Sequence, residues 1–352
     1  MCDFSCYGGA SEEWLAVADS LPPPPPADMP LTEVVRLNNE KREIMAAEAM
    51  ESLRPKVHIR DYSIPTRDGS SVEGRSYRPV SADAATRLPV YIHLHGGGYM
   101  FGSLSSEDAI CSRIALNAQV VVLNVNYRHT PEHTYPTAWH DVQDAFEWAH
   151  AHIDDLGGDG QKLLIGGISA GSTLAASLTL EQHLGRVAAN LPRVAGQVLM
   201  VPSLSNIGWH EPQVGQLKDP SVSSYKENEN APILPVKMIH FFTSLLKIEN
   251  VEAEGTKLNP GNATPEQVVG LPPTIFGVAG LDPLRDEGLL YAKMLAEAGV
   301  PTDINVFVGL PHAFAMVGDK LSATKRWNEV MENGIQWALT KPRATKEFTV
   351  KT

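Results

Sequence analysis

From Pro89 onward the sequence alternates short β-rich runs with helical stretches, and this alternation limits the possible fold more than any other feature. The β-rich runs are PVYIHLH, QVVVLNVNY, QKLLIGG, AGQVLMVPS, PTIFGVAG and TDINVFVG. Most are followed by a segment with helical periodicity, such as 138–152, 170–184 and 287–298. Strands that alternate with helices form a largely parallel sheet covered by helices. The sequence therefore predicts an α/β fold with a mostly parallel central sheet.

The segments before Pro89 follow different patterns. Five consecutive prolines, residues 22–26, fix an extended segment and separate a predicted N-terminal tail, residues 1–30, from the body. A helical pattern follows over residues 31–53. Residues 57–79 then alternate apolar and polar side chains around an Asp-Gly pair. This pattern predicts an antiparallel hairpin at a sheet edge.

Residues 203–260 interrupt the α/β alternation. They contain polar loops and one apolar, helix-like run, PVKMIHFFTSLLKI, but no convincing strand. Insertions of this kind often form a lid over a site, although an ordinary packing helix explains the run equally well.

The stretch GGISAGST, residues 166–173, lies at a predicted strand-to-helix junction. In that context G-x-S-x-G predicts a nucleophile elbow, a sharp turn that exposes the oxygen of Ser169 at the top of the sheet. Side chains at Gly167 and Gly171 would collide with the backbone of such a turn. One alternative is a small-residue turn that only packs helix against strand. A phosphate-binding loop is a second alternative, but the sequence has neither glycine pattern typical of one.

A glycine run, HGGGY, follows the strand predicted at 89–95. Consecutive glycines there can turn bare N–H groups toward a developing negative oxygen, as in an oxyanion hole. A glycine run on its own is usually just a flexible loop. A glycine run at a strand end, upstream of a serine elbow, favours the oxyanion hole.

Two more strand ends carry residues that could complete a catalytic triad. Asp282 follows the strand in FGVAGLD, and His312 follows the strand in VFVGLPH. Open α/β sheets place their ligands at these carboxyl ends. An Asp before Pro is most often a turn or cap, and most of the 12 histidines should be surface or packing residues. The chain order of serine, acid and histidine nevertheless favours a triad of Ser169, Asp282 and His312.

Charge and composition exclude several function classes. The chain has 29 Lys and Arg against 41 Asp and Glu, a formal net charge of −12, which repels nucleic acids and anionic membranes. No stretch approaches the roughly 18 apolar residues that span a bilayer, and the N-terminus lacks a signal-peptide pattern. An odd count of three cysteines fits a reducing compartment. We therefore expect a cytoplasmic protein with a small-molecule partner and no nucleic-acid or membrane partner.

Five motifs in a fixed order resemble those of the hormone-sensitive-lipase-like carboxylesterases of the α/β-hydrolase superfamily. The resemblance runs from about residue 57 to 340. The motifs are HGGGY (95–99), NYRHTPEHTYP (126–136), GISAG (167–171), DPLRDEG (282–288) and PHAF (311–314).

The resemblance implies a role for each motif residue. Ser169 would be the nucleophile, His312 the general base and Asp282 the carboxylate that orients it. The oxyanion hole would be formed by three backbone amides, those of Gly97, Gly98 and Ala170. Neither a metal nor an organic cofactor is implied.

The resemblance also implies an α/β-hydrolase fold with a helical cap. Residues 31–56 and 203–260 would form the cap, and residues 57–202 and 261–345 the catalytic core. Dimers are common in the family, so a homodimer is compatible with it.

Two positions depart from the family pattern. Ile168 stands where Asp or Thr is usual, and Ser172 stands where Gly is usual. We expect the triad to survive both changes, while Ile168 removes a polar group near the nucleophile.

The implied function is hydrolysis of carboxylic esters of small, fairly apolar molecules with short to medium acyl groups, through an acyl-enzyme. One alternative is a cyclase, dehydratase or acyl transferase that acts on a specialised, polyketide-like metabolite with the same fold. A second is a non-enzymatic small-molecule receptor, a role of relatives that have lost the catalytic histidine. Because His312 is present, the receptor is the weaker alternative.

Overall fold

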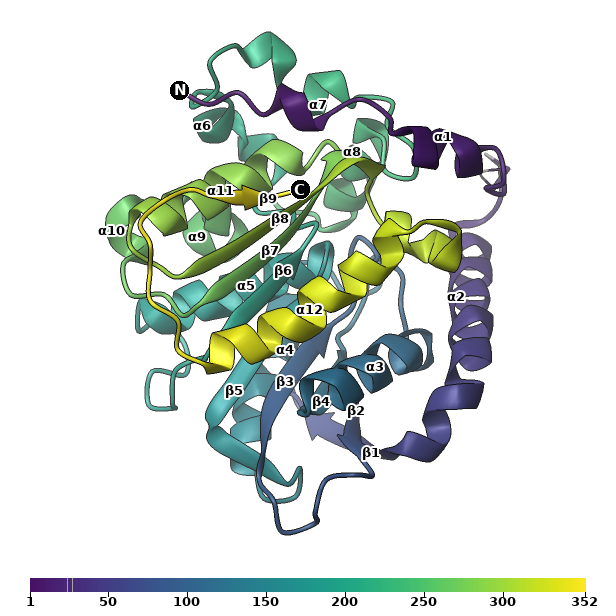
Figure 1. Ribbon diagram of the computed structural model, residues 1–352, viewed down its shortest axis with the longest axis vertical. Coiled ribbons are helices and arrows are strands. Elements are labelled where there is room, and N and C mark those ends of the chain that lie inside the picture. The colour runs from purple at the N-terminus through teal and green to yellow at the C-terminus, as the bar shows by residue number, and fades with distance from the viewer. Residues whose placement is uncertain (24, 27) are drawn as a thin grey trace.

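A mostly parallel sheet forms the centre of the molecule (Figure 1). The computed structural model describes residues 1–23, 25, 26 and 28–352. Its nine strands follow the order β1-β2-β4-β3-β5-β6-β7-β8-β9. They are β1 (Val57–Pro65), β2 (Ser71–Pro79), β3 (Leu88–Leu94), β4 (Val121–Asn126), β5 (Gly158–Ile168), β6 (Gln197–Met200), β7 (Thr274–Leu281), β8 (Thr302–Pro311) and β9 (Val350–Lys351).

The strand register confirms the predicted α/β fold. β1 and β2 form the expected antiparallel hairpin at one edge, in which Val57 pairs with Pro79. β2 is antiparallel to β4, and every pairing from β4 to β9 is parallel. All six β-rich runs of the sequence are strands β3 to β8. The short C-terminal strand β9 was not anticipated.

Helices cover both faces of the sheet. α3 and α12 lie on the face turned toward the viewer in Figure 1, and α4, α5 and α11 lie behind the strands. Each face has its own apolar core, because the buried strands present side chains to both sides. The helices are α1 (Glu12–Ala18), α2 (Leu31–Leu53), α3 (Asp108–Ala118), α4 (Thr137–Ala151), α5 (Ala170–His183), α6 (Glu211–Val214), α7 (Ser224–Glu227), α8 (Val236–Leu245), α9 (Gly255–Leu258), α10 (Pro265–Val268), α11 (Arg285–Glu297) and α12 (Ala323–Leu339).

The N-terminal segment packs on the body, which corrects the prediction of a tail over residues 1–30. Trp14 of α1 is only 1% exposed and joins the core around Phe307 and Trp327. The backbone of Ser11 donates a hydrogen bond to the Gly309 carbonyl at the end of β8. Burying an indole is strongly favourable, and the sequence pattern of so short a helix did not reveal it. In the polyproline run, Pro24 lies outside the described residues.

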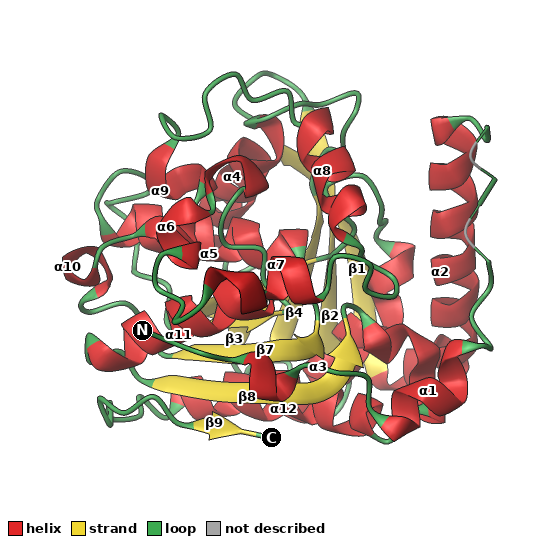
Figure 2. Ribbon diagram, turned by 90° about the horizontal axis from the view of Figure 1, so that it is seen from above, coloured by secondary structure: helices red, strands yellow, loops and turns green. Residues whose placement is uncertain are grey.

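Parts of both segments expected to form a cap contact the carboxyl end of β3: Arg42 of α2 donates to the Gly96 carbonyl, and Phe242 of the insertion lies over Gly98. α2 spans 31–53 as predicted and packs against α3 and the short 3₁₀ turn Ser105–Glu107 at the side of the molecule (Figure 2). The insertion 203–260 contains α6 to α9 and, within the described residues, no strand. None of the helices described here is long and apolar enough to cross a membrane.

Candidate active site

The predicted elbow is present at the junction of β5 and α5. Ser169 has φ 55° and ψ −118°, a strained conformation for a residue with a side chain and one that marks functional turns. The carbonyl oxygens of Leu94 and His95 crowd Gly171, so that a Cβ there would overlap both. A Cβ at Gly167 would likewise meet the Leu94 carbonyl. The expected reason for both glycines is therefore confirmed.

The structure brings together the three side chains that the sequence proposed as a triad. His312 Nε2 lies 2.9 Å from Ser169 Oγ, and His312 Nδ1 lies 2.7 Å from Asp282 Oδ2. Asp282 is 1% exposed and His312 is 6% exposed. The backbone N–H of Leu284 donates to Asp282 Oδ1 at 3.0 Å and so fixes the plane of the carboxylate. These contacts form one continuous hydrogen-bonded line from the acid to the serine.

The glycine loop after β3 offers free amides beside this line. Gly97 and Gly98 have φ of 137° and 61°, which side chains rarely tolerate. The Gly97 carbonyl accepts hydrogen bonds of 3.0 Å from the N–H groups of Met100 and Phe101. Within the described residues, the N–H groups of Gly97 and Gly98 have no acceptor. Ala170 opens α5, where the first amides of a helix also lack intrahelical partners.

Residues of the motif at 126–136 pack against the glycine loop and hydrogen-bond to its backbone. The Tyr127 ring stacks on His95 at 4.3 Å, and its hydroxyl donates to the His95 carbonyl at 2.7 Å. The backbone N–H of Thr130 donates to the Tyr99 carbonyl at 2.8 Å. Burial lowers the pKa of His95 to about 3 and that of His129 to about 4. Both rings are therefore neutral near pH 7, and together with Tyr127 they form an uncharged aromatic cluster beside the loop.

The motif at 282–288 ties the acid loop to the insertion. Arg285 is fully buried and forms ion pairs of 2.8 Å with Asp286 and with Glu227 of α7. The N–H of Ser224, also on α7, donates to Asp286 at 2.7 Å. The loop that carries Asp282 is thus linked to the insertion 203–260.

Ser172 and Ile168, the two departures from the family pattern, both contact neighbouring backbone. The fully buried Ser172 hydroxyl accepts from the Met200 N–H at 2.9 Å and lies 2.6 Å from the Gly167 carbonyl. It therefore joins the ends of β5 and β6 beside the elbow. Ile168 packs against Gly96, since a Cβ on that glycine would come within 3.3 Å of Ile168 Cγ2. Neither residue takes part in the hydrogen bonds that join Asp282, His312 and Ser169.

Sequence reasoning did not find the side chains of α8 and α2 that contact the glycine loop and the residues after it. The ring of Phe242, on α8, lies over Gly98, so that a Cβ there would come within 2.6 Å of Phe242 Cγ. Asn39 and Arg42, on α2, hydrogen-bond to the backbone of Gly102 and Gly96. The apolar run 235–248 was a signal for Phe242, whereas the polar residues of α2 resemble an ordinary solvated helix face.

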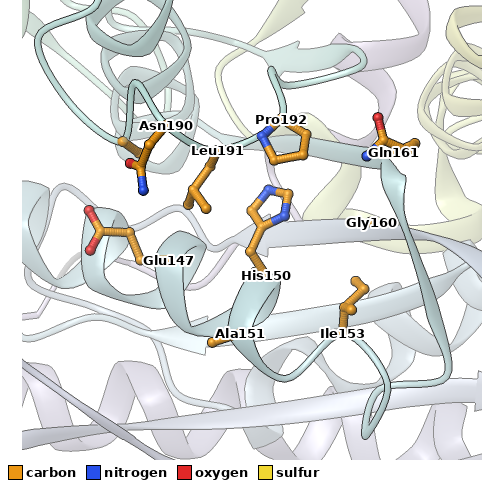
Figure 3. A pocket seen from close by; sticks show the side chains of 10 residues that line it. Glu147, His150, Ala151, Ile153, Gly160, Gln161, Asn190, Leu191 and Pro192 are labelled. Carbon is orange, nitrogen blue, oxygen red and sulfur yellow. The ribbon is translucent and has the colours of Figure 1, made fainter.

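A separate hollow of about 480 Å³ lies between the end of α4 and the 188–192 loop (Figure 3). His150 and Glu147 line one side of it, and Gly160 lies at the other. Gly160 is about 26 Å along β5 from the elbow, at about 3.3 Å per residue. The hollow is therefore at the opposite end of the sheet from Ser169. In the described part of the chain, no cluster of His, Cys, Asp or Glu is suited to holding a metal ion.

A family model for the alpha/beta hydrolase fold matches residues 91–316. The chain belongs to the alpha/beta hydrolase fold family. It is 32% identical to the carboxylesterase NlhH of Mycobacterium tuberculosis over 290 residues, which cover 78% of this chain and 84% of the relative.

Two solved structures are similar to the chain over most of its length. Vibralactone cyclase has a TM-score of 0.85 at 27% identity, covering 97% of each chain. The carboxylesterase EstE1, from a metagenomic library, has a TM-score of 0.76 at 29% identity, covering 90% of this chain and 99% of its own. The predicted hormone-sensitive-lipase-like carboxylic ester hydrolase is thereby confirmed.

Proposed function

We propose that Ser169, His312 and Asp282 are the triad of this carboxylic ester hydrolase. The observation that carries the proposal is the line of hydrogen bonds from Asp282 through His312 to the Ser169 hydroxyl, 2.7 and 2.9 Å long. His312 takes the proton of Ser169 as its oxygen attacks the ester carbonyl. The carboxylate of Asp282 keeps the other proton of the ring on Nδ1, so that Nε2 is free to accept.

The oxyanion formed in this step is stabilised by the amides of Gly97, Gly98 and Ala170. Free N–H groups in a preorganised, water-poor site stabilise developing charge strongly. His312 then returns its proton to the leaving alcohol, which leaves an acyl-enzyme on Ser169. Water, deprotonated by His312, attacks the acyl-enzyme and releases the acid. All of these steps use the chain's own residues.

The substrates are small, fairly apolar esters with short to medium acyl groups. Supporting this, α8 covers the glycine loop with an aromatic pair, Phe242 against Phe101, whose ring centroids are 6.0 Å apart. We propose α2 and residues 203–260 as the cap that encloses the site. NlhH and EstE1 are carboxylesterases, which fits small esters.

The experiment is hydrolysis of a p-nitrophenyl ester series, from acetate to palmitate, by the wild-type protein and Ser169→Ala. We expect serine-dependent turnover with its maximum at short to medium chains. A folded Ser169→Ala protein that keeps the wild-type rate would exclude Ser169 as the nucleophile.

A second candidate, a cyclase on the same triad, is favoured by the similarity to vibralactone cyclase over 97% of both chains. A hydroxyl group within the acyl chain can attack the acyl-enzyme instead of water. This closes a lactone ring and frees the Ser169 hydroxyl, and no oxygen is taken from the solvent. Thioesters whose acyl chain carries a hydroxyl group distinguish the two candidates. In ¹⁸O-labelled water a hydrolase gives the labelled free acid, and a cyclase gives an unlabelled lactone.

A further inference from the structure

The orientation of the Gly97 amide is set from outside the glycine loop. The Gly96 carbonyl accepts a hydrogen bond of 3.2 Å from Arg42 Nη1. It also lies 3.2 Å from His95 Nδ1. In a trans peptide the carbonyl and the following N–H point in opposite directions within one plane. A donor that holds the Gly96 oxygen on the α2 side therefore turns the Gly97 N–H toward the other side, where the oxyanion would form.

The guanidinium of Arg42 is itself held by a buried acid. Arg42 Nη2 donates to Glu107 Oε1 at 2.7 Å, and Glu107 Oε2 lies 3.0 Å from His93 Nε2. Glu107 is 2% exposed and His93 is fully buried. Burial alone would raise the pKa of Glu107, but the His93 hydrogen bond and the Arg42 charge outweigh it and keep that pKa below its usual range. Arg42 is thus fixed at two points through two different nitrogens, which a planar guanidinium presents in a fixed fork and an ammonium does not.

Two neighbours of Arg42 on the same helix face complete the contact. Asn39 donates to the Gly102 carbonyl at 3.2 Å and accepts from the Gly102 N–H at 2.9 Å. Glu43 accepts a hydrogen bond of 2.6 Å from the Ser103 hydroxyl. Positions three and four apart lie on one side of a helix. α2 is therefore joined by polar contacts to Gly96 in the glycine loop and to Gly102 and Ser103 just after it.

We propose that Arg42 is a positioning residue for the oxyanion hole, acting from the N-terminal cap helix through the Gly96–Gly97 peptide. This inference rests on the proposed function of Ser169. Arg42 touches no reacting atom, so its loss should reorient one donor without removing it. Deleting an oxyanion donor costs about 10²–10³ in kcat. Since His95 still lies beside the Gly96 carbonyl, we expect a smaller loss of about 10- to 30-fold.

The test compares Arg42→Met and Arg42→Lys with a control, Arg36→Met. Arg36 is on the same helix but is exposed, and in the described chain it pairs with Glu33 and Glu40 of α2 itself. Three quantities are measured: kcat and KM for a p-nitrophenyl ester, the rate at which a fluorophosphonate modifies Ser169, and the melting temperature.

For Arg42→Met we expect kcat and the phosphonylation rate to fall by the same factor, about 10- to 30-fold, with KM nearly unchanged. Arg42→Lys keeps a charge beside Glu107 but lacks the fixed pair of nitrogens, so it should recover part of the loss. Arg36→Met should behave like the wild type. A merely structural role would lower the melting temperature without separating kcat from KM.

The inference is overturned if Arg42→Met matches Arg36→Met in kcat and phosphonylation, or if only KM changes. If Arg42→Met does not fold, Arg42→Lys decides between the same two outcomes. The fluorophosphonate also separates this inference from the proposed function. A wild-type protein that is modified at Ser169 but cleaves no ester would refute ester hydrolysis, and the phosphonylation rates would still test Arg42.

Discussion

Replacing Asp282 with Asn changes one atom and should nearly abolish turnover. The Leu284 N–H donates to Asp282 Oδ1 at 3.0 Å, so the amide oxygen of the new side chain takes that place. Its NH₂ group then replaces Oδ2, which lies 2.7 Å from His312 Nδ1. An NH₂ group only donates, and His312 must therefore present an unprotonated Nδ1. The ring proton moves to Nε2, facing Ser169 Oγ at 2.9 Å, and the ring cannot accept the serine proton.

The expected loss of kcat follows from this change in the His312 tautomer. The equivalent change in a serine protease triad lowers kcat about 10⁴-fold, which is about 5 kcal/mol at about 1.4 kcal/mol per tenfold. We expect a loss of that size for Asp282→Asn, with KM and the melting temperature little changed. Stopped or continuous assay of p-nitrophenyl butyrate hydrolysis measures the loss, and thermal unfolding measures the stability.

The matched control is Asp286→Asn, in the same motif. Asp286 accepts from buried Arg285 at 2.8 Å and does not contact His312. Weakening a buried ion pair should lower the free energy of unfolding by about 3 kcal/mol, while kcat stays within about threefold because the His312 tautomer is unchanged. If Asp282→Asn keeps more than about a tenth of the wild-type kcat, or if the two variants lose the same activity, the assignment of Asp282 as the orienting acid is wrong.

Two further predictions concern the cap and the glycine loop. Phe242→Ala removes the ring over Gly98. It should raise kcat/KM for the octanoate ester relative to the acetate ester by about fourfold for each methylene newly buried, whereas Phe241→Ala should leave this ratio unchanged. Equal chain-length profiles for the two variants would contradict the prediction. The pKa values of His95 and His129 lie at about 3 and about 4, below the value of about 6.5 in an unfolded chain. The unfolded state therefore binds more protons below pH 6.5, and urea unfolding should show stability falling from there toward pH 4, with a shallower slope in His129→Gln.

The local parts of the site were predictable because each one satisfies a requirement within a few residues. A strained turn excludes side chains at Gly167 and Gly171, and a parallel sheet requires functional residues at the carboxyl ends of its strands. These constraints leave a pattern in the sequence, and the structure places Ser169, Asp282 and His312 within hydrogen-bonding distance as the pattern required.

Packing between distant segments was less predictable. The first residues were expected to form a tail because the proline run separates them from the body. The helix they contain, α1, has only 7 residues. Trp14 is nevertheless buried in a core cluster that includes Phe307 and Trp327, about 300 positions later. No local pattern of charge or hydropathy records a partner that far away.

The polar face of α2 shows why a functional contact can leave no signal at all. Asn39, Arg42 and Glu43 are spaced as on any solvated helix face, and the sequence offers no reason to separate them from Arg36 and Glu40. What distinguishes them is the set of backbone groups that they face. The glycine loop exposes carbonyls and amides that no strand or helix satisfies, and such groups need partners when they are buried. A loop rich in free amides therefore requires a polar cap surface. We expect the residues of that surface to hold the loop in shape, so that a substitution on α2 changes the rate at a serine that it never touches.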